Sequence, residues 1–454
     1  MAAAPSILVL PQVPGGARGA RLCIGYSGGL DSTVLLHLAS TAAAWQGRLL
    51  ALHVHHGLHP EADTWVAHCT RVCAGLGVPL QVLRVEVDRS GGDGLEAAAR
   101  QARHAAFASV LKTGDVLALA HHQDDQAETF LLRALRASGV DGLAAMRAWR
   151  ACGDAWLWRP LLAHPRADVL AYARSHGLCW VDDPGNAQIR HDRNFLRQCV
   201  LPVLRQRWPH AGAALAASAG LSAQAGDLLR LSDDISCTDV RGPEPGTLSI
   251  ACLRRLPRAR RARVLRHWII DRGLPPLPAR GVAQIEATVL PARADALAEF
   301  AWGDAIVRAW SGALHAAVRR PALPANWEAH WDGRAPLQLP AGGTLQLEGV
   351  DALPEPVVLH ARRGGERILL PGRAHRHALK QVLQDLRVPP WVRVRLPLLS
   401  DAGGTLLAAG DRIYAAAFDS WLKARRARLR WIDVDDGSPD ASRLEAAHEG
   451  PQLS

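Results

Sequence analysis

Features that define whole protein classes are missing from this 454-residue sequence. It has no uninterrupted run of about 18 apolar residues, which argues against a membrane-spanning helix. Its eight cysteines include no C-x-x-C pair, and none lies in the last 200 residues. We therefore expect reduced thiols, and not a disulfide framework, a zinc site or an iron–sulfur site.

The start of the chain also lacks the pattern of a secretory signal. No basic segment precedes its apolar residues, and Pro11 and Pro14 interrupt the stretch that follows. We therefore expect a cytoplasmic protein that has no contact with a membrane.

Lysine is scarce, since the chain contains only Lys112, Lys380 and Lys423. The basic side chains are almost all arginine, and their distribution is uneven. Residues 360–430 contain 15 Lys and Arg against 5 Asp and Glu, whereas 433–454 contain 6 acidic residues and one Arg. A concentrated basic block indicates a polyanionic partner, with nucleic acid the first choice. The alternative is a solvated basic face in an arginine-rich composition.

In the first half of the chain, short apolar runs alternate with segments of helical spacing. The strand candidates are 21–26, 49–55, 80–87 and 115–120. This alternation predicts an α/β fold with a doubly wound, Rossmann-like parallel sheet. Because ligands bind at the carboxyl ends of such strands, residues 27–32, 55–57 and 121–125 should converge on one site.

Changes of composition along the chain predict four parts. Residues 1–210 form the α/β catalytic domain, and the Ala-rich start of 211–320 predicts a helical linker and middle domain. Short strand-like runs with Gly turns predict a small, basic α+β domain at 335–432. The tail at 433–454 is expected to be acidic and disordered.

The segment at the first strand end is a candidate phosphate loop. It reads Ser27, Gly28, Gly29, Leu30, Asp31, Ser32. A helix beginning here would leave backbone N–H groups free for phosphate, and the paired glycines allow close approach. Since no lysine precedes Lys112, phosphate charge must be neutralised by Mg²⁺ or arginine, and Asp31 is the candidate metal ligand. The alternative is a plain βα turn with Asp31 or Ser32 as helix cap.

A second acidic segment follows the strand at 115–120. We expect a helix capped by Asp124, which would place Asp125 and Glu128 on one face. Two carboxylates at this edge are expected to bind a cation, either a metal ion or an ammonium group. The alternative is an acidic first helical turn stabilised by the helix dipole.

The phosphate-loop motif SGGLDS resembles that of the N-type ATP pyrophosphatases, or PP-loop family, which cleave ATP to AMP and pyrophosphate. Within that family the chain is similar to the tRNA(Ile)-lysidine synthetases. The segments that carry this similarity are 53–69, 95–107, 120–146, 159–162, 180–209 and 362–399. The chain departs from the family pattern at Ala137, which replaces a glycine, at His104, which replaces a tyrosine, and at Gly185, which replaces a serine.

The resemblance implies an ATP- and Mg²⁺-dependent carbon–nitrogen ligase. Such an enzyme adenylates the wobble cytidine in the CAU anticodon of tRNA(Ile) and then joins L-lysine to its C2 atom, forming lysidine. It would take Asp31, Asp125 and Glu128 as catalytic residues, with Asp125 and Glu128 binding lysine. His53 and His55, on the second predicted strand, would join residues 27–32 in contacting ATP. The oligomeric state stays open, with a homodimer among the alternatives.

Basic side chains from two regions are candidates for contact with tRNA. They are Arg133, Arg193, Asn194, Arg197 and Arg205 in the first region, and Arg363, Arg367, Arg373, Lys380, Arg393 and Arg395 in the second. For each of them a solvated basic face is the alternative. Two other functions remain open: a PP-loop tRNA thiolase, which the missing C-x-x-C pair disfavours, and a non-catalytic protein that binds nucleotide and RNA.

Overall fold

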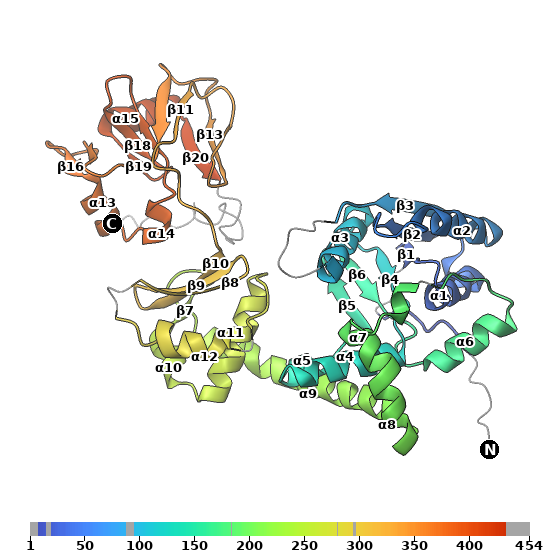
Figure 1. Ribbon diagram of the computed structural model, residues 1–454. Helices are drawn as coiled ribbons and strands as arrows, with labels where there is room; N and C mark the ends of the chain where they lie inside the picture. The colour runs from blue at the N-terminus through green and yellow to red at the C-terminus, as the bar shows by residue number, and fades with distance from the viewer. Residues whose placement is uncertain are drawn as a thin grey trace, which may run out of the picture. The chain divides into compact units, whose positions relative to one another are not determined.

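The computed structural model describes residues 8–14, 20–87, 95–182, 184–278, 280–293 and 297–432. The chain divides into two compact units, Met1–Leu229 and Arg230–Ser454 (Figure 1). The boundary falls within the long helix α9 (Ala211–Asp239).

A six-stranded sheet in the order β3-β2-β1-β4-β6-β5 forms the centre of the first unit. Its strands are β1 (Leu22–Gly25), β2 (Leu49–His55), β3 (Leu80–Arg84), β4 (Val116–Ala118), β5 (Trp149–Cys152) and β6 (Ala155–Trp158). All neighbouring pairs are parallel except β5 and β6. The predicted doubly wound parallel sheet is therefore confirmed. Sequence reasoning missed the β5–β6 hairpin, which turns at Gly153 with a φ of 61°.

Helices cover both faces of this sheet because both faces of its strands are apolar. Leu22 and Ile24 of β1 belong to a core with α1, α2 and α6, whereas Cys23 packs on the other side with Phe107 of α3. The helices of this unit are α1 (Leu30–Thr41), η1 (Ala43–Trp45), α2 (Ala62–Gly75), α3 (Leu95–Val110), α4 (Gln123–Leu135), α5 (Val140–Leu143), α6 (Arg166–Ser175), η2 (Pro184–Ala187), α7 (Asp192–Phe195), η3 (Leu196–Val200) and α8 (Leu201–Arg207).

The strand order reverses between β1 and β4, which brings two of the predicted loops together. His122 Nε2, after β4, lies 3.6 Å from Asp31 Oδ2, after β1. The expected convergence of 27–32 and 121–125 is therefore confirmed. At the end of β2, His55 contacts Asp63, with 3.4 Å between Nε2 and Oδ1, and the convergence of residues 55–57 on this site stays a prediction.

The second unit begins with helices and a small antiparallel sheet in the order β7-β10-β9-β8. These elements are α10 (Ile250–Arg255), α11 (Arg258–Asp271), α12 (Gly281–Gln284), η4 (Ile285–Val289), β7 (Leu248–Ser249), β8 (Ala298–Trp302), β9 (Ala305–Trp310) and β10 (Ala313–Val318). The expected helices are present, but sequence reasoning missed the sheet.

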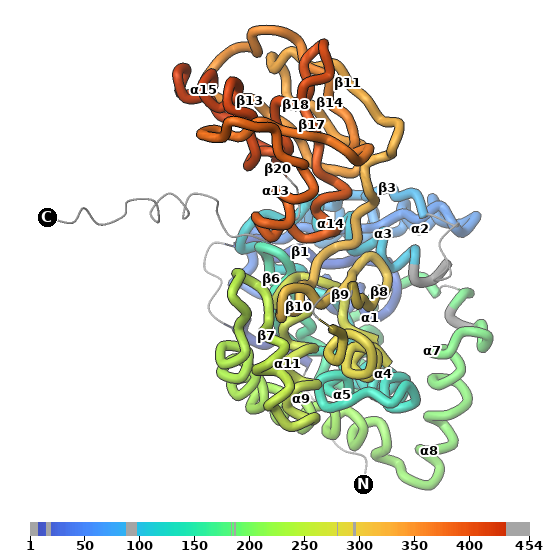
Figure 2. The backbone as a smooth tube through the Cα atoms, turned by 90° about the vertical axis from the view of Figure 1, so that its left-hand side faces the viewer, coloured from blue at the N-terminus to red at the C-terminus, as the bar shows by residue number. Residues whose placement is uncertain are grey.

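The C-terminal part combines antiparallel sheets with helices, as expected for a small α+β fold. Figure 2 traces its backbone. Its strands are β11 (Glu328–Trp331), β12 (Leu337–Gln338), β13 (Thr344–Glu348), β14 (Val357–His360), β15 (Arg367–Ile368), β16 (His377–Ala378), β17 (Leu398–Ser400), β18 (Leu406–Ala409), β19 (Ile413–Tyr414) and β20 (Arg428–Ile432). Its helices are α13 (Leu379–Asp385), α14 (Pro390–Arg393) and α15 (Ala416–Arg425). The proposed domain limits stay predictions, and the tail at 433–454 lies outside the described residues.

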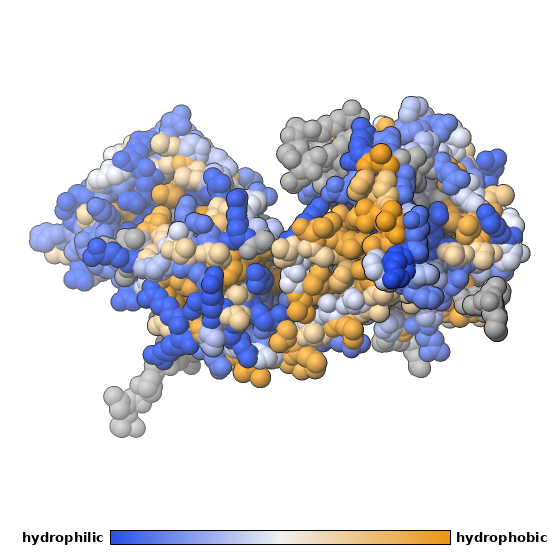
Figure 3. All heavy atoms as spheres, turned by 60° about the horizontal axis from the view of Figure 1, so that its bottom comes forward, coloured by the Kyte–Doolittle hydropathy of each residue, from blue (hydrophilic) through white to orange (hydrophobic). Residues whose placement is uncertain are grey.

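Helix α9 carries a row of exposed large apolar side chains. They are Leu221, Leu228, Leu231 and Ile235, each 65–73% exposed. Figure 3 shows the face of the molecule on which this helix lies, and apolar side chains are visible on that face. Among the described residues, no helix combines the length and apolarity needed to cross a bilayer.

Helix α4 ends in a turn that normally favours glycine. The N–H of Ala137 donates to Ala134 O and that of Ser138 to Arg133 O, which is the Schellman pattern. Ala137 has a φ of 54°, in the left-handed region. This is the position at which the resemblance leads us to expect glycine, so alanine here carries backbone strain.

Substituting Ala137→Gly should raise the free energy of unfolding by about 1 kcal/mol, because glycine adopts this φ without the Cβ clash. Urea denaturation provides the measurement. The matched control is Ala134→Gly, which lies one turn earlier in helical conformation and should lower stability by about 1 kcal/mol. Equal losses for both variants would contradict the assignment of strain to Ala137.

Candidate active site

The loop after β1 has the form of a phosphate cradle. Helix α1 starts at Leu30 with Gly29 as its N-cap, and glycine has no side chain that could cap the first-turn N–H groups. Gly28 has a φ of 83°, and a Cβ placed there would lie 2.9 Å from Cys69 Sγ. Both the backbone conformation and the close packing therefore require glycine at this position. The first-turn N–H groups of α1 are available to an anion.

Hydroxyl groups and the irregular segment after α6 hold this loop in shape. Ser27 Oγ and Ser32 Oγ lie 3.0 Å apart, and Ser32 Oγ also donates to Gly29 O at 3.0 Å. The backbone N–H of Val181 donates to Gly28 O at 2.9 Å. The segment around Val181 is therefore part of the loop's support, a contact that the sequence did not indicate.

Asp31 sits in the first turn of α1 and presents two unlike oxygens. Oδ2 faces His122 Nε2, whereas Oδ1 is buried and has no hydrogen-bond partner among the described residues. A buried carboxylate oxygen without a donor is suited to a cation. The residues present therefore fit a Mg²⁺ ion at the phosphate loop.

His122 caps helix α4, so the expectation of Asp124 as the cap is wrong. Its Nδ1 accepts the N–H of Asp125 at 3.3 Å, and the Asp125 carboxylate accepts the N–H of His122 at 3.0 Å. This reciprocal box starts the helix at Gln123, one residue before Asp124. Asp124 instead accepts a hydrogen bond from Arg205 at 2.9 Å.

Asp125 and Glu128 lie together, as their spacing predicts, and each is paired with arginine. Glu128 is fully buried; its two oxygens accept from Arg193 Nε at 2.8 Å and Arg197 Nε at 2.7 Å. Arg197 Nη2 also donates to Asp125 Oδ1 at 2.9 Å. These four side chains, here called the ion cluster, join the first two turns of α4 to the segment α7–η3.

Burial and neighbouring charges oppose each other at this site. Burial alone would raise the pKa of Asp125, but His122 and Arg193 outweigh it and hold that pKa below its usual value. Burial would lower the pKa of His122, but the Asp31 and Asp125 carboxylates raise it overall. Protonation of Nδ1 would, however, cost α4 its cap. The helix cap therefore favours the neutral imidazole of His122, whereas the two carboxylates favour the imidazolium.

The two histidines assigned to ATP lie in different surroundings. His53 is buried beneath the loop, with Nδ1 3.0 Å from Tyr26 O and 3.4 Å from Cys69 Sγ. Burial lowers the pKa of His53 and raises that of Cys69 to about 12, so both groups are neutral. His53 is hydrogen-bonded within the protein and His55 lies against Asp63, and the assignment of both histidines to ATP stays a prediction.

Comparison with known proteins identifies the family. The PP-loop domain model matches residues 9–204, the TilS substrate binding domain model 248–315 and the TilS substrate C-terminal domain model 357–431. A tRNA(Ile)-lysidine synthase of Xanthomonas campestris pv. campestris is 52% identical over 434 residues, covering 95% of this chain and 98% of that protein. Another, from Alkalilimnicola ehrlichii, is 45% identical over 390 residues, covering 83% of this chain and 86% of that protein.

This chain belongs to the tRNA(Ile)-lysidine synthase family. The resemblance drawn from its sequence motifs is thereby confirmed. The family match also covers the middle of the chain, where sequence motifs were least informative.

The basic residues of the first unit that were assigned to tRNA have partners within the protein. Arg133 Nη1 donates to Gly142 O at 2.8 Å and so supports the turn between α4 and α5. Asn194 Nδ2 donates to Gln188 O at 2.9 Å. Arg193, Arg197 and Arg205 pair with the acidic residues of α4. Their contact with tRNA stays a prediction.

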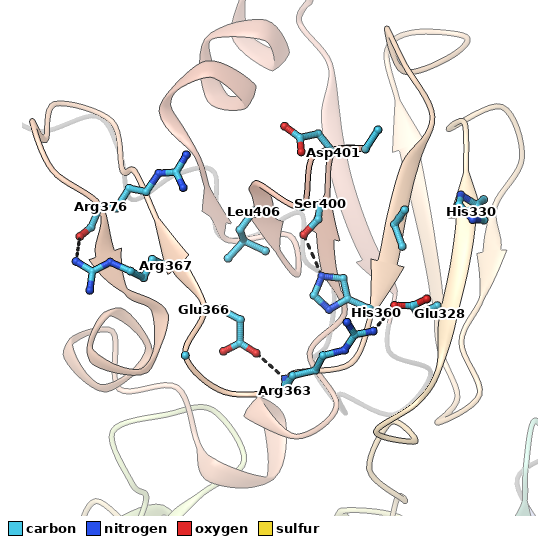
Figure 4. Close-up of a pocket in the computed structure, with 14 residues that line it drawn as sticks. Glu328, His330, His360, Arg363, Glu366, Arg367, Arg376, Ser400, Asp401 and Leu406 are labelled. Atoms are coloured by element: carbon cyan, nitrogen blue, oxygen red, sulfur yellow. Dashed lines mark hydrogen bonds and ion pairs between the residues drawn. The ribbon is translucent and has the colours of Figure 1, made fainter.

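In the region matched by the family's C-terminal domain model, some of the assigned side chains line a pocket of about 560 Å³ (Figure 4). Arg367 and Arg376 lie at one side, whereas Arg363 lies near Glu328 and His360. Arg367 Nη2 donates to Arg376 O at 2.7 Å. This pocket therefore presents three arginines together with acidic side chains.

The remaining C-terminal candidates differ in exposure. Arg373 and Lys380 are exposed, and Arg395 is half-buried. Arg393 donates to Val388 O at 2.6 Å and so stabilises the turn after α13. Arg373 and Lys380 are therefore better placed than Arg393 to meet a polyanion.

Removing one arginine of the ion cluster should cost stability. Arg197→Ala leaves the buried Glu128 carboxylate with only Arg193, and we expect the free energy of unfolding to fall by about 3 kcal/mol. Urea denaturation near neutral pH measures this loss.

The matched control is Arg136→Ala, at the C-terminal end of α4. Arg136 pairs with Asp192 at 3.7 Å, with both side chains more than 70% exposed, so its loss should cost less than about 1 kcal/mol. Equal small losses for both variants would show that Glu128 does not depend on Arg197.

Proposed function

We propose that this chain forms lysidine by joining L-lysine to C2 of the wobble cytidine in the CAU anticodon of tRNA(Ile), with ATP converted to AMP and pyrophosphate. One observation carries the proposal beyond family membership. Asp31 of the phosphate loop and Asp125 of the ion cluster both contact His122, at 3.6 and 3.4 Å from its Nε2. An adenylating site and a site for a charged second substrate therefore share one edge of the sheet.

The first step requires a nucleotide held with its α-phosphorus open to attack. The C2 carbonyl oxygen of cytidine attacks that phosphorus, and pyrophosphate leaves. The N–H groups at the start of α1, with Ser27 and Ser32, are suited to the phosphate oxygens. Asp31 would hold Mg²⁺ through Oδ1. When bound, the ion would neutralise charge on the leaving pyrophosphate.

In the second step the lysine ε-amine attacks C2, the C–O bond breaks and AMP leaves with the oxygen. Lysine brings two ammonium groups and one carboxylate, and the ion cluster offers charges of both signs. We assign the ammonium groups to Asp125 and Glu128, and the α-carboxylate to Arg193 or Arg197. Exchange of ion pairs with such a substrate would keep the buried charges of the cluster compensated.

The tRNA substrate is a polyanion, and the basic C-terminal part suits it. Exposed Arg373 and Lys380, with the arginines around the pocket, are candidates for phosphate contacts away from the anticodon. We assign the reaction to the cytoplasm, where ATP, lysine and tRNA occur together.

Substituting Asp31→Ala should abolish tRNA-dependent exchange of labelled pyrophosphate into ATP, because the loop loses its metal ligand. Affinity for the tRNA transcript, measured by filter binding, should stay within a few-fold of wild type, since the C-terminal basic surface is intact. A variant with normal pyrophosphate exchange would refute the assignment of Asp31. A variant that loses tRNA affinity equally would indicate a folding defect, which circular dichroism would reveal.

A further inference from the structure

The imidazole of His122 is buried, 1% exposed, between the phosphate loop and the first turn of α4. Its two nitrogens serve different partners. Nδ1 accepts the N–H of Asp125 and caps the helix. Nε2 lies 3.6 Å from Asp31 Oδ2 and 3.4 Å from Asp125 Oδ2. The ring therefore bridges the two acidic groups assigned to the two steps of the reaction.

Helix capping alone does not account for a histidine here. Serine, threonine, aspartate and asparagine are the preferred N-caps, since one short acceptor satisfies the N–H. What the imidazole adds is a second nitrogen on the far side of its ring, and that nitrogen faces Asp31. The capping bond also fixes the orientation of the ring, because Nδ1 must stay directed at Asp125 N.

The proton on Nε2 is present in either state of the ring. In the neutral form Nδ1 accepts from the helix, so the ring hydrogen resides on Nε2; in the imidazolium both nitrogens carry hydrogen. His122 therefore directs a donor at the two carboxylates whether or not it is charged.

We propose that His122 is a positioning residue for Asp31: its Nε2–H orients the carboxylate through Oδ2, so that the buried Oδ1 is presented to the metal of the metal–ATP complex. Asp31 Oδ1, which has no hydrogen-bond partner among the described residues, is the oxygen left for that contact. This inference rests on the proposed function, because it assigns His122 to the nucleotide step.

Two substitutions distinguish the roles of the two ring nitrogens of His122. Asparagine at 122 keeps an acceptor near the position of Nδ1 and is a good N-cap, but it has no atom that reaches Asp31. Glutamine carries an amide N–H near the position of Nε2 but caps poorly. His122→Asn should keep the thermal midpoint of the wild type and His122→Gln should lower it.

Electron paramagnetic resonance measures the affinity for Mn²⁺ in the presence of α,β-methylene-ATP. For this affinity, unlike for the thermal midpoint, His122→Asn should be the more affected of the two variants. His122→Asn should weaken binding about 10- to 100-fold, as expected when a group that orients a metal ligand is removed. His122→Gln should stay within a few-fold of wild type. His375→Asn, at an exposed histidine in the C-terminal part, is the control and should change neither quantity.

Wild-type affinity in His122→Asn would overturn the inference, and so would equally weak binding in both variants. If His122→Gln fails to fold, the folded His122→Asn variant still decides the question. A wild-type protein that does not bind the Mn²⁺–nucleotide complex would overturn the phosphate-loop assignment and this inference together, which distinguishes failure of the proposed function from failure of His122 alone.

Discussion

The buried carboxylate of Glu128 is the constraint on which the catalytic edge depends. Its side chain is fully enclosed, and an ionised carboxylate in such a place is costly unless hydrogen-bonded cations compensate it. Arg193 and Arg197 supply those cations from a segment more than 60 residues further along the chain. Because the charge must be compensated, the segment α7–η3 has to lie against α4, and this closes one side of the site.

The remaining features of the site follow from how α4 begins. His122 and Asp125 cap the helix reciprocally, which sets the direction of the first turn and hence of both acidic side chains. The reversal of strand order places that turn beside the loop after β1. A nucleotide site and an ion cluster that could receive a zwitterion are thereby neighbours, as a two-step ligation requires.

Much of this arrangement could be predicted from the sequence. Strand β2 has its predicted limits of 49–55, and the glycine-rich loop and the spacing of Asp125 and Glu128 indicated the site, because these signals are local. The sheet β7–β10 was missed, since strands such as Ala313–Val318 are alanine-rich and alanine favours helices. The partners of Arg193 and Arg197 were missed because a basic side chain does not reveal in sequence which distant carboxylate it meets. His122 was missed because histidine is not a preferred helix cap.

Lysidine formation is tested by incorporation of radiolabelled L-lysine into a CAU-anticodon tRNA(Ile) transcript, with ATP and Mg²⁺, followed by nucleoside analysis. Label is expected on the wobble cytidine, with one AMP formed for each lysine joined. Turnover of ATP to AMP in the presence of tRNA, without label on that nucleoside, would contradict the proposed formation of lysidine. Such a result would still support an adenylating site, and it would indicate that the ion cluster binds a second substrate other than lysine.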